Sequence, residues 1–96
     1  MIQKLILIDD QLPARLAALE TAAGITFEMG TVAQILADSE EDQISEKHYA
    51  LYESSSVRIT AQVDAYEPDD IFIRVEASDK VEAKYLKLLD ELFPRY

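Results

Sequence analysis

The chain contains no cysteine, no tryptophan, only two glycines and a single histidine, His48, among its 96 residues. Without cysteine there are no disulfide bonds, no thiolate ligands for zinc and no thiol nucleophile. One histidine cannot form a cluster of imidazole ligands, and two separated glycines leave no glycine-rich phosphate loop. No G-x-S-x-G motif marks a serine nucleophile. We therefore expect a protein that is not an enzyme and that holds no cofactor and no metal.

Long hydrophobic runs are also missing. The run of branched aliphatic residues at positions 5–8 (LILI) is far shorter than the ~20 residues that a membrane span requires. It is also too short for the core of a signal peptide, and two aspartates follow it directly. We expect no membrane contact and a cytoplasmic location.

Basic residues are scarce, because 9 Lys and Arg stand against 19 Asp and Glu, giving a net charge of −10. Binding to nucleic acid or to an anionic membrane depends on Lys and Arg, so direct binding to either is disfavoured. The charge instead favours a larger protein with a basic surface, including a protein that itself binds nucleic acid. A hydrophobic content of 49% is typical of a globular fold, and the length predicts a single domain over residues 1–96.

Two periodicities divide the chain into elements. Alternation with a period of two predicts strands at 47–53, 57–66 and 71–77, which turn residues join into an antiparallel meander. Residues 3–9 predict a further strand, and their four consecutive aliphatics indicate a central strand buried on both faces. Helical spacing predicts helices over 10–24, 32–38 and 79–93, with a short strand at 25–29 between the first two. The order β-α-(β)-α-β-β-β-α is an α+β two-layer sandwich.

Local signals set the expected ends and registers. Asp10, the Thr31–Gln34 pair and the Asp79–Glu82 pair have the form of helix N-caps, and Gly24 and Pro94 are stop signals. In the last helix, the stripe through Val81, Tyr85, Leu88 and Leu92 predicts that Leu88 is buried against the meander.

The alternation also restricts strand pairing, because inward side chains of the meander occupy odd positions and paired residues must share parity. We expect Tyr52 opposite Arg58 in the first hairpin, a cation–π pair. In the second hairpin we expect Asp64 opposite Arg74 and Tyr66 opposite Phe72.

The segment LILIDDQ, followed by an amphipathic helix, resembles the opening of a response-regulator receiver domain. In that family an acidic pair after the first strand holds Mg²⁺, and Asp9 and Asp10 match this pair. The resemblance covers about the first quarter of the chain. No later strand ends in the aspartate that accepts phosphate, and no Lys-Pro pair completes the site. We therefore interpret Asp9 as the end of the strand and Asp10 as a helix cap.

Acidic residues form two rows. The first contains Asp38, Glu40, Glu41, Asp42 and Glu46, and the second contains Glu67, Asp69 and Asp70. A calcium-binding loop would need Gly and Glu where Gln43 and Tyr49 stand, so the first row is no such loop. Carboxylates at phosphate-like spacing predict either a solvated surface or a site that docks on a basic partner, in the sharper version by mimicking DNA.

The outward face of the meander supplies a second candidate site. It is predicted to carry aromatic and arginine side chains, which are enriched at the centres of protein interfaces. These are Tyr52, Arg58, Tyr66, Phe72 and Arg74.

The sequence leaves three functional hypotheses open. The first is a small acidic, non-catalytic protein-binding domain that inhibits a larger protein, a profile that resembles the composition of anti-CRISPR, other anti-defence and toxin-immunity proteins. The second is an assembly protein that forms a homodimer through its sheet and the edge strand 47–53. The third is a degenerate receiver-like metal-binding domain that uses Asp9 and Asp10.

Overall fold

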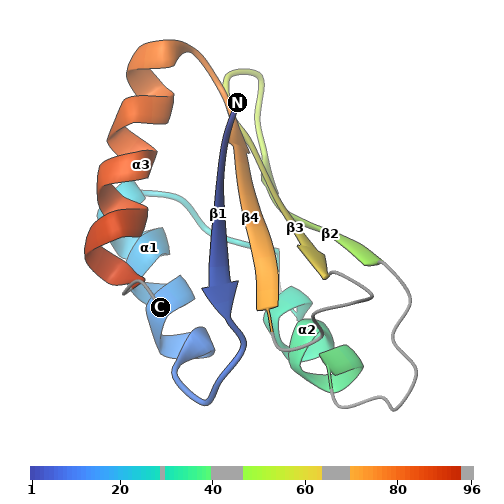
Figure 1. Cartoon of the computed structure of the whole chain (residues 1–96). Helices are drawn as coiled ribbons and strands as arrows, with labels where there is room; N and C mark the ends of the chain where they lie inside the picture. The colour runs from blue at the N-terminus through green and yellow to red at the C-terminus, as the bar shows by residue number, and fades with distance from the viewer. Residues whose placement is uncertain (29, 40–46, 64–69, 94–96) are drawn as a thin grey trace.

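A computed structural model describes residues 1–28, 30–39, 47–63 and 70–93 of the chain (Figure 1). The fold is α+β, as predicted, with a four-stranded antiparallel sheet that does not close into a barrel. In chain order the elements are β1 (Ile2–Leu7), α1 (Leu12–Ala23), α2 (Thr31–Ser39), β2 (Lys47–Glu53), β3 (Arg58–Val63), β4 (Asp70–Glu76) and α3 (Asp79–Leu92).

The strand order is β1-β4-β3-β2, so β1 lies at an edge of the sheet. The prediction of a central strand was therefore wrong. β1 pairs with β4 alone, from Ile2 opposite Val75 to Leu7 opposite Asp70. Its even positions face the core, whereas Leu5 and Leu7 point to the other side and remain 39% and 40% exposed. Four consecutive aliphatics do not distinguish burial on both faces from an edge strand whose outward leucines are exposed.

The two hairpins differ in how well their registers were predicted. Between β2 and β3, Tyr49 lies opposite Ala61, as the parity argument requires. A β-bulge at Leu51 then shifts the pairing, so that Tyr52 lies opposite Ile59 and not opposite Arg58. The bulge turns Tyr52 towards the core, which makes the predicted outward position of Tyr52 wrong.

In the second hairpin, Thr60 lies opposite Arg74 and Gln62 lies opposite Phe72. The predicted partners of Arg74 and Phe72, Asp64 and Tyr66, belong to residues 64–69, outside the described part of the chain. Odd positions still pair with odd positions, as expected. The predicted register was wrong, because Arg74 and Phe72 face Thr60 and Gln62. The rule that odd positions pair with odd positions therefore predicted which face is buried, but it did not determine the register between the strands.

One face of the sheet is the core. The odd positions of β3 and β4 from Ile59 to Val63 and from Ile71 to Val75 are at most 1% exposed. α1 packs against α3 on this side, and α2 packs against β2 (Figure 1). We call the opposite side the outer face, and no helix of the described residues lies on it. Its side chains are those of Gln3, Leu5, Leu7, His48, Ala50, Arg58, Thr60, Gln62, Phe72, Arg74 and Glu76.

Helix α1 follows the predicted pattern but not the predicted cap. Leu12, Leu16 and Leu19 are buried, and Gly24 ends the helix in the left-handed conformation at φ 71°. The N-cap position belongs to Gln11, whose backbone N–H donates to the Asp9 carboxylate at 2.8 Å. Asp10 is exposed, so its predicted role as the cap was wrong; Asp9, one residue earlier, satisfies the free backbone group.

Residues 25–28 form no strand, contrary to the prediction. Phe27 is buried, and the N–H of Glu28 donates to the carbonyl of Leu51 at 2.9 Å, which ties the segment to β2 by a single backbone bond. Helix α2 then begins at Thr31 itself, and the side chain of Gln34 donates forwards to Asp38. The predicted capping box, in which Gln34 would reach back, is therefore absent.

Helix α3 begins one residue earlier than a cap at Asp79 would place it, because Ser78 holds the N-cap position. Glu82 is buried and accepts hydrogen bonds from the Ala77 N–H at 3.2 Å and from the amino group of Met1 at 2.7 Å. The hydrogen bond from this amino group, followed by the bond from Ala77, lowers the pKa of Glu82 below its ordinary value.

The stripe that α3 buries is rotated from the predicted one. Tyr85, Leu89 and Phe93 are at most 4% exposed, whereas Leu88 is only half-buried. Burial raises the pKa of Tyr85, with a smaller contribution from the neighbouring Tyr52. Leu88 therefore lies at the margin of the core and not at its centre, where the sequence pattern placed it.

This rotation predicts unequal costs for two neighbouring substitutions. Leu89→Ala removes a fully buried side chain and should lower the free energy of unfolding by about 2–5 kcal/mol, whereas Leu88→Ala should cost less than about 2 kcal/mol. Urea denaturation of both variants measures the difference. Equal costs, or a larger cost at Leu88, would show that the predicted stripe and not the observed one faces the core.

Candidate functional site

The centre of the outer face is occupied by Arg74. Cross-strand pairing places it between Gln3 of β1 and Thr60 of β3, with Phe72 two residues before it on the same face. Arg74 is half-buried, and its Nε atom is inaccessible to solvent and has no hydrogen-bond partner. Among the described residues, no carboxylate lies within 4.0 Å of its guanidinium.

The other half-buried cations all have carboxylate partners. Lys4 contacts Asp90, Arg15 lies 3.3 Å from Asp9, and Lys47 lies 3.4 Å from Asp38. A desolvated charge without a counter-charge is unfavourable, and in a chain with a net charge of −10 carboxylates are abundant. Arg74 therefore differs from the other partly buried cations of the described chain.

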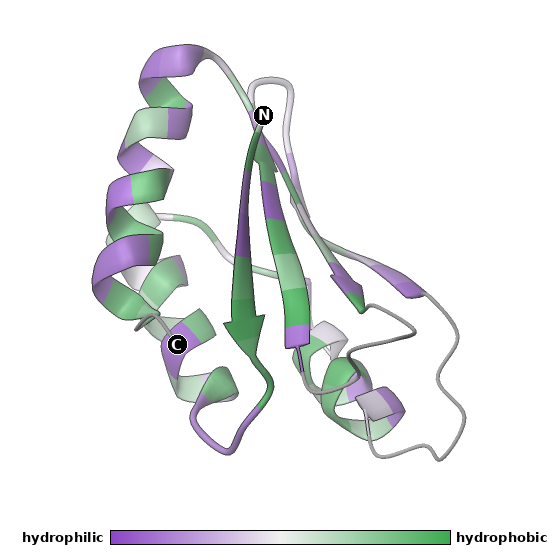
Figure 2. Cartoon of the chain, viewed as in Figure 1, coloured by the Kyte–Doolittle hydropathy of each residue, from purple (hydrophilic) through white to green (hydrophobic). Residues whose placement is uncertain are grey.

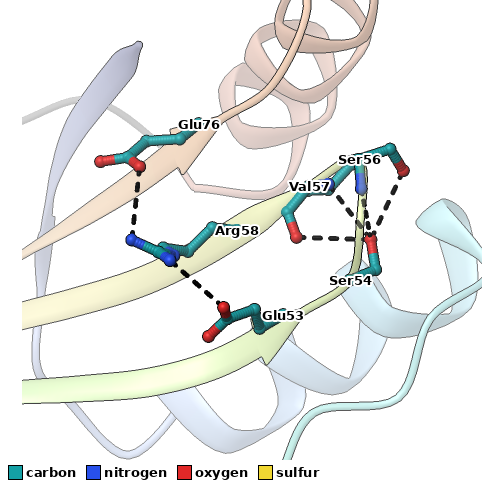
Figure 3. A network of polar contacts seen from close by, with 6 residues as sticks. All are labelled: Glu53, Ser54, Ser56, Val57, Arg58 and Glu76. Atoms are coloured by element: carbon teal, nitrogen blue, oxygen red, sulfur yellow. Dashed lines mark hydrogen bonds and ion pairs between the residues drawn. The ribbon is translucent and has the colours of Figure 1, made fainter.

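Arg58, the other arginine of this face, is already neutralised. Its guanidinium lies 3.2 Å from Glu53 across the hairpin and 3.9 Å from Glu76 on β4 (Figure 3). All three side chains are about half exposed or more, so the pairs contribute little to stability. The predicted contact of Arg58 with Tyr52 is replaced by these pairs, because the bulge moves Tyr52 to the core side.

The turn beside Arg58 is organised by serine, as predicted for residues 54–56. The Ser54 N–H donates to the Val57 carbonyl at 2.8 Å. The Ser54 hydroxyl accepts from the Val57 N–H at 3.1 Å (Figure 3). These bonds close the β2–β3 hairpin. They leave the turn a structural element and supply no nucleophile with a neighbouring base.

One residue of the first acidic row, Asp38, is buried. Asp38 is only 8% exposed and accepts hydrogen bonds from the Tyr49 hydroxyl at 2.7 Å and from Gln34 at 2.8 Å. The Tyr49 bond is the main cause that lowers the pKa of Asp38 below its ordinary value of 3.8, and Gln34 and Lys47 add to it against the opposing effect of burial. Asp38 therefore joins α2 to β2 inside the fold, and its contact with a partner stays a prediction.

Most of the remaining acidic candidates lie outside the described residues. These are Glu40, Glu41, Asp42, Glu46, Glu67 and Asp69, together with the aromatic candidate Tyr66. Asp70 is described: it opens β4, is half-buried and lies opposite Leu7. The acidic rows thus stay a prediction, and the structure brings together Phe72 and Arg74 with the two β1 leucines, Leu5 and Leu7.

Asp9 and Asp10, which match the acidic pair of receiver domains, lie in different surroundings. Asp9 accepts from the Gln11 N–H and from Arg15, whereas Asp10 is exposed. Over the described ranges, no three His, Asp or Glu side chains are grouped in a way that would hold a metal ion. The receiver-like hypothesis therefore gains no support from geometry.

Comparison with models of protein families, with curated proteins and with solved structures finds no match to this chain. Within the described residues, no helix combines the length and the apolar character that crossing a bilayer requires.

The Asp38 contact predicts a specific pH dependence of stability. Because the folded-state pKa lies below the unfolded value near 3.8, the Tyr49 bond stabilises the fold above that pH. The stabilisation is lost as pH falls through the folded-state pKa. Tyr49→Phe should therefore lower the free energy of unfolding at neutral pH, and the difference from the parent should shrink in strong acid.

Urea denaturation between neutral pH and about pH 2 measures this difference, with Tyr52→Phe as the matched control from the same strand. The cost of Tyr52→Phe should not depend on pH in this way. Parallel curves for the parent and Tyr49→Phe across the whole range would contradict the assignment of Asp38.

Proposed function

We propose that this chain is a non-catalytic protein-binding domain that contacts its partner through the outer face, with Arg74 at the centre of the contact. The observation that carries the proposal is the half-buried guanidinium of Arg74, which has no counter-charge among the described residues. A partner carboxylate placed there would form a charge-assisted hydrogen bond in a partly desolvated site.

The surroundings of Arg74 favour protein as the partner. Phe72 lies beside it on β4, and Leu5 lies opposite Phe72 on β1. Apolar side chains around a charged pair exclude water and so strengthen the pair, and arginine and aromatic residues dominate the binding energy of protein interfaces. A partner surface complementary to this site would present a carboxylate among apolar side chains.

The net charge of −10 adds a second requirement. Outside the central contact, long-range attraction favours a partner with a basic rim. A domain that occupies such a surface on a larger protein needs no catalytic group. The function we propose is therefore that of an inhibitor or antagonist of that protein. DNA mimicry by the acidic rows is the second candidate, and it differs because its contacts would be with Lys and Arg of the partner.

Selection from a displayed peptide library on the immobilised domain distinguishes these candidates. The parent should enrich peptides with one Asp or Glu between apolar residues. Arg74→Gln should weaken binding of those peptides about tenfold or more, which corresponds to the loss of about 1.4 kcal/mol. The fold should be unchanged because Arg74 has no polar partner among the described residues that the substitution would remove.

Arg58→Gln is the matched control, since it removes the same charge from the same face at a position already paired with Glu53. It should leave the selection unchanged. Enrichment of Lys- and Arg-rich peptides that is insensitive to Arg74→Gln would overturn the proposal in favour of the acidic rows.

A further inference from the structure

Exposed apolar side chains gather at one edge of the sheet. Among the described residues, the large hydrophobic side chains that are more than a third exposed are Met1, Leu5, Leu7 and Leu86. Leu5 and Leu7 belong to β1, and Met1 directly precedes it. Figure 2 shows β1 as strongly hydrophobic over its second half.

Leu86 borders the same edge from the helical layer. It lies on α3 four residues before Asp90, and residues spaced by four share one face of a helix. Asp90 contacts the ammonium group of Lys4 on β1, so this face of α3 is directed towards β1. β1 therefore has exposed leucines on the outer side of the sheet and Leu86, 42% exposed, beside it on the core side.

The two edges of the sheet are protected very differently. β2 carries the bulge at Leu51, and the Leu51 carbonyl accepts from the Glu28 N–H. Bulges and covering segments are the devices that prevent an edge strand from pairing with another chain. β1 instead pairs with β4 over six residues without a bulge and contains no proline. Its one charged residue, Lys4, is turned to Asp90 and has a side chain only 11% exposed.

We propose that β1 is a dimerisation edge, and that its occupant is a second copy of this chain whose β1 adds in antiparallel orientation about a twofold axis. An unprotected, regular and apolar strand is a template for backbone pairing. β1 carries no acidic side chain, so it is the edge at which two chains of charge −10 can approach with least repulsion. This contact differs from the one proposed for Arg74 because it pairs the backbone of the edge strand, and the two contacts share Leu5 on the outer face.

The alternation of β1 restricts the register of the dimer. Facing residues must share parity, so that Leu5 and Leu7 stay on the outer side in both copies. Placing Lys4 opposite Lys4 of the second copy would oppose like charges. Placing Ile6 opposite itself sets Leu5 opposite Leu7 of the second copy, which joins four exposed leucines into one row across the twofold axis. The two Leu86 side chains then flank the joint on the helical side.

The strength of the dimer should depend on salt in a characteristic direction. A joint of one strand pair with flanking leucines is at the small end of stable interfaces, which bury about 1,200 Å² or more. Added salt screens the repulsion between two acidic chains, so it should tighten the dimer. A contact held by ion pairs would weaken under the same change.

Sedimentation equilibrium of the parent and two lysine variants tests the proposal. Leu5→Lys places a charge on the proposed joint, and Ala50→Lys places the same charge on the outer side of β2. The parent and Ala50→Lys should show a concentration-dependent dimer. Leu5→Lys should be monomeric, although its less negative net charge reduces the repulsion between the two chains. A parent that stays monomeric at the highest soluble concentration in high salt overturns the proposal, as does equal dimerisation of all three.

Because the chain has no native cysteine, oxidative cross-linking tests the register. A mixture of the Leu5→Cys chain and the Leu7→Cys chain should form a cross-linked heterodimer, and each chain alone should cross-link at least tenfold less. Cross-linking of the Leu5→Cys chain with itself at an equal rate would overturn this register, and no cross-linking in either case would overturn pairing through β1.

Discussion

The alternation of side chains along β3 and β4 is the constraint on which the rest of the structure depends. Their odd positions, from Ile59 to Val63 and from Ile71 to Val75, are at most 1% exposed and define one face of the sheet as the core. Burying this face is the dominant favourable contribution to folding. The helices cover it from one side, with α1 packed on α3 and with Asp38 holding α2 to β2. Among the described residues, no helix lies on the outer face, which is the face we propose for binding.

This arrangement explains which structural predictions succeeded. A period of two along three consecutive segments specifies strands, and the turn residues between them specify a meander, so the α+β order could be read directly. Gly24 could be assigned as a helix end because few other residues adopt a positive φ. The position of β1 in the sheet could not be predicted from the sequence, because the run LILI is compatible with a central strand and with an edge strand. Only the tertiary pairing with β4 decides between them.

The candidate site was predicted in part, and the failures have distinct physical causes. Phe72 and Arg74 were assigned to the outer face because parity alone determines it. Tyr52 was assigned there wrongly, since no sequence signal marks the bulge at Leu51. The lack of a partner for Arg74 among the described residues could not be foreseen, because the predicted register gave it Asp64. Asp38 appeared as part of a solvated row, although Tyr49 eleven residues later accounts for its burial.

Both proposals depend on the outer face being open to solvent, and thiol reactivity measures this most directly. Thr60 lies on that face opposite Arg74, and Ala61, its neighbour on β3, is fully buried on the core side. In a chain without native cysteine, Thr60→Cys should react with a soluble thiol reagent directly in the folded state, without prior unfolding. Ala61→Cys should react only through unfolding, slower by about a thousandfold or more for a domain of ordinary stability. Equal protection of both thiols would show that the outer face is covered and would contradict the account.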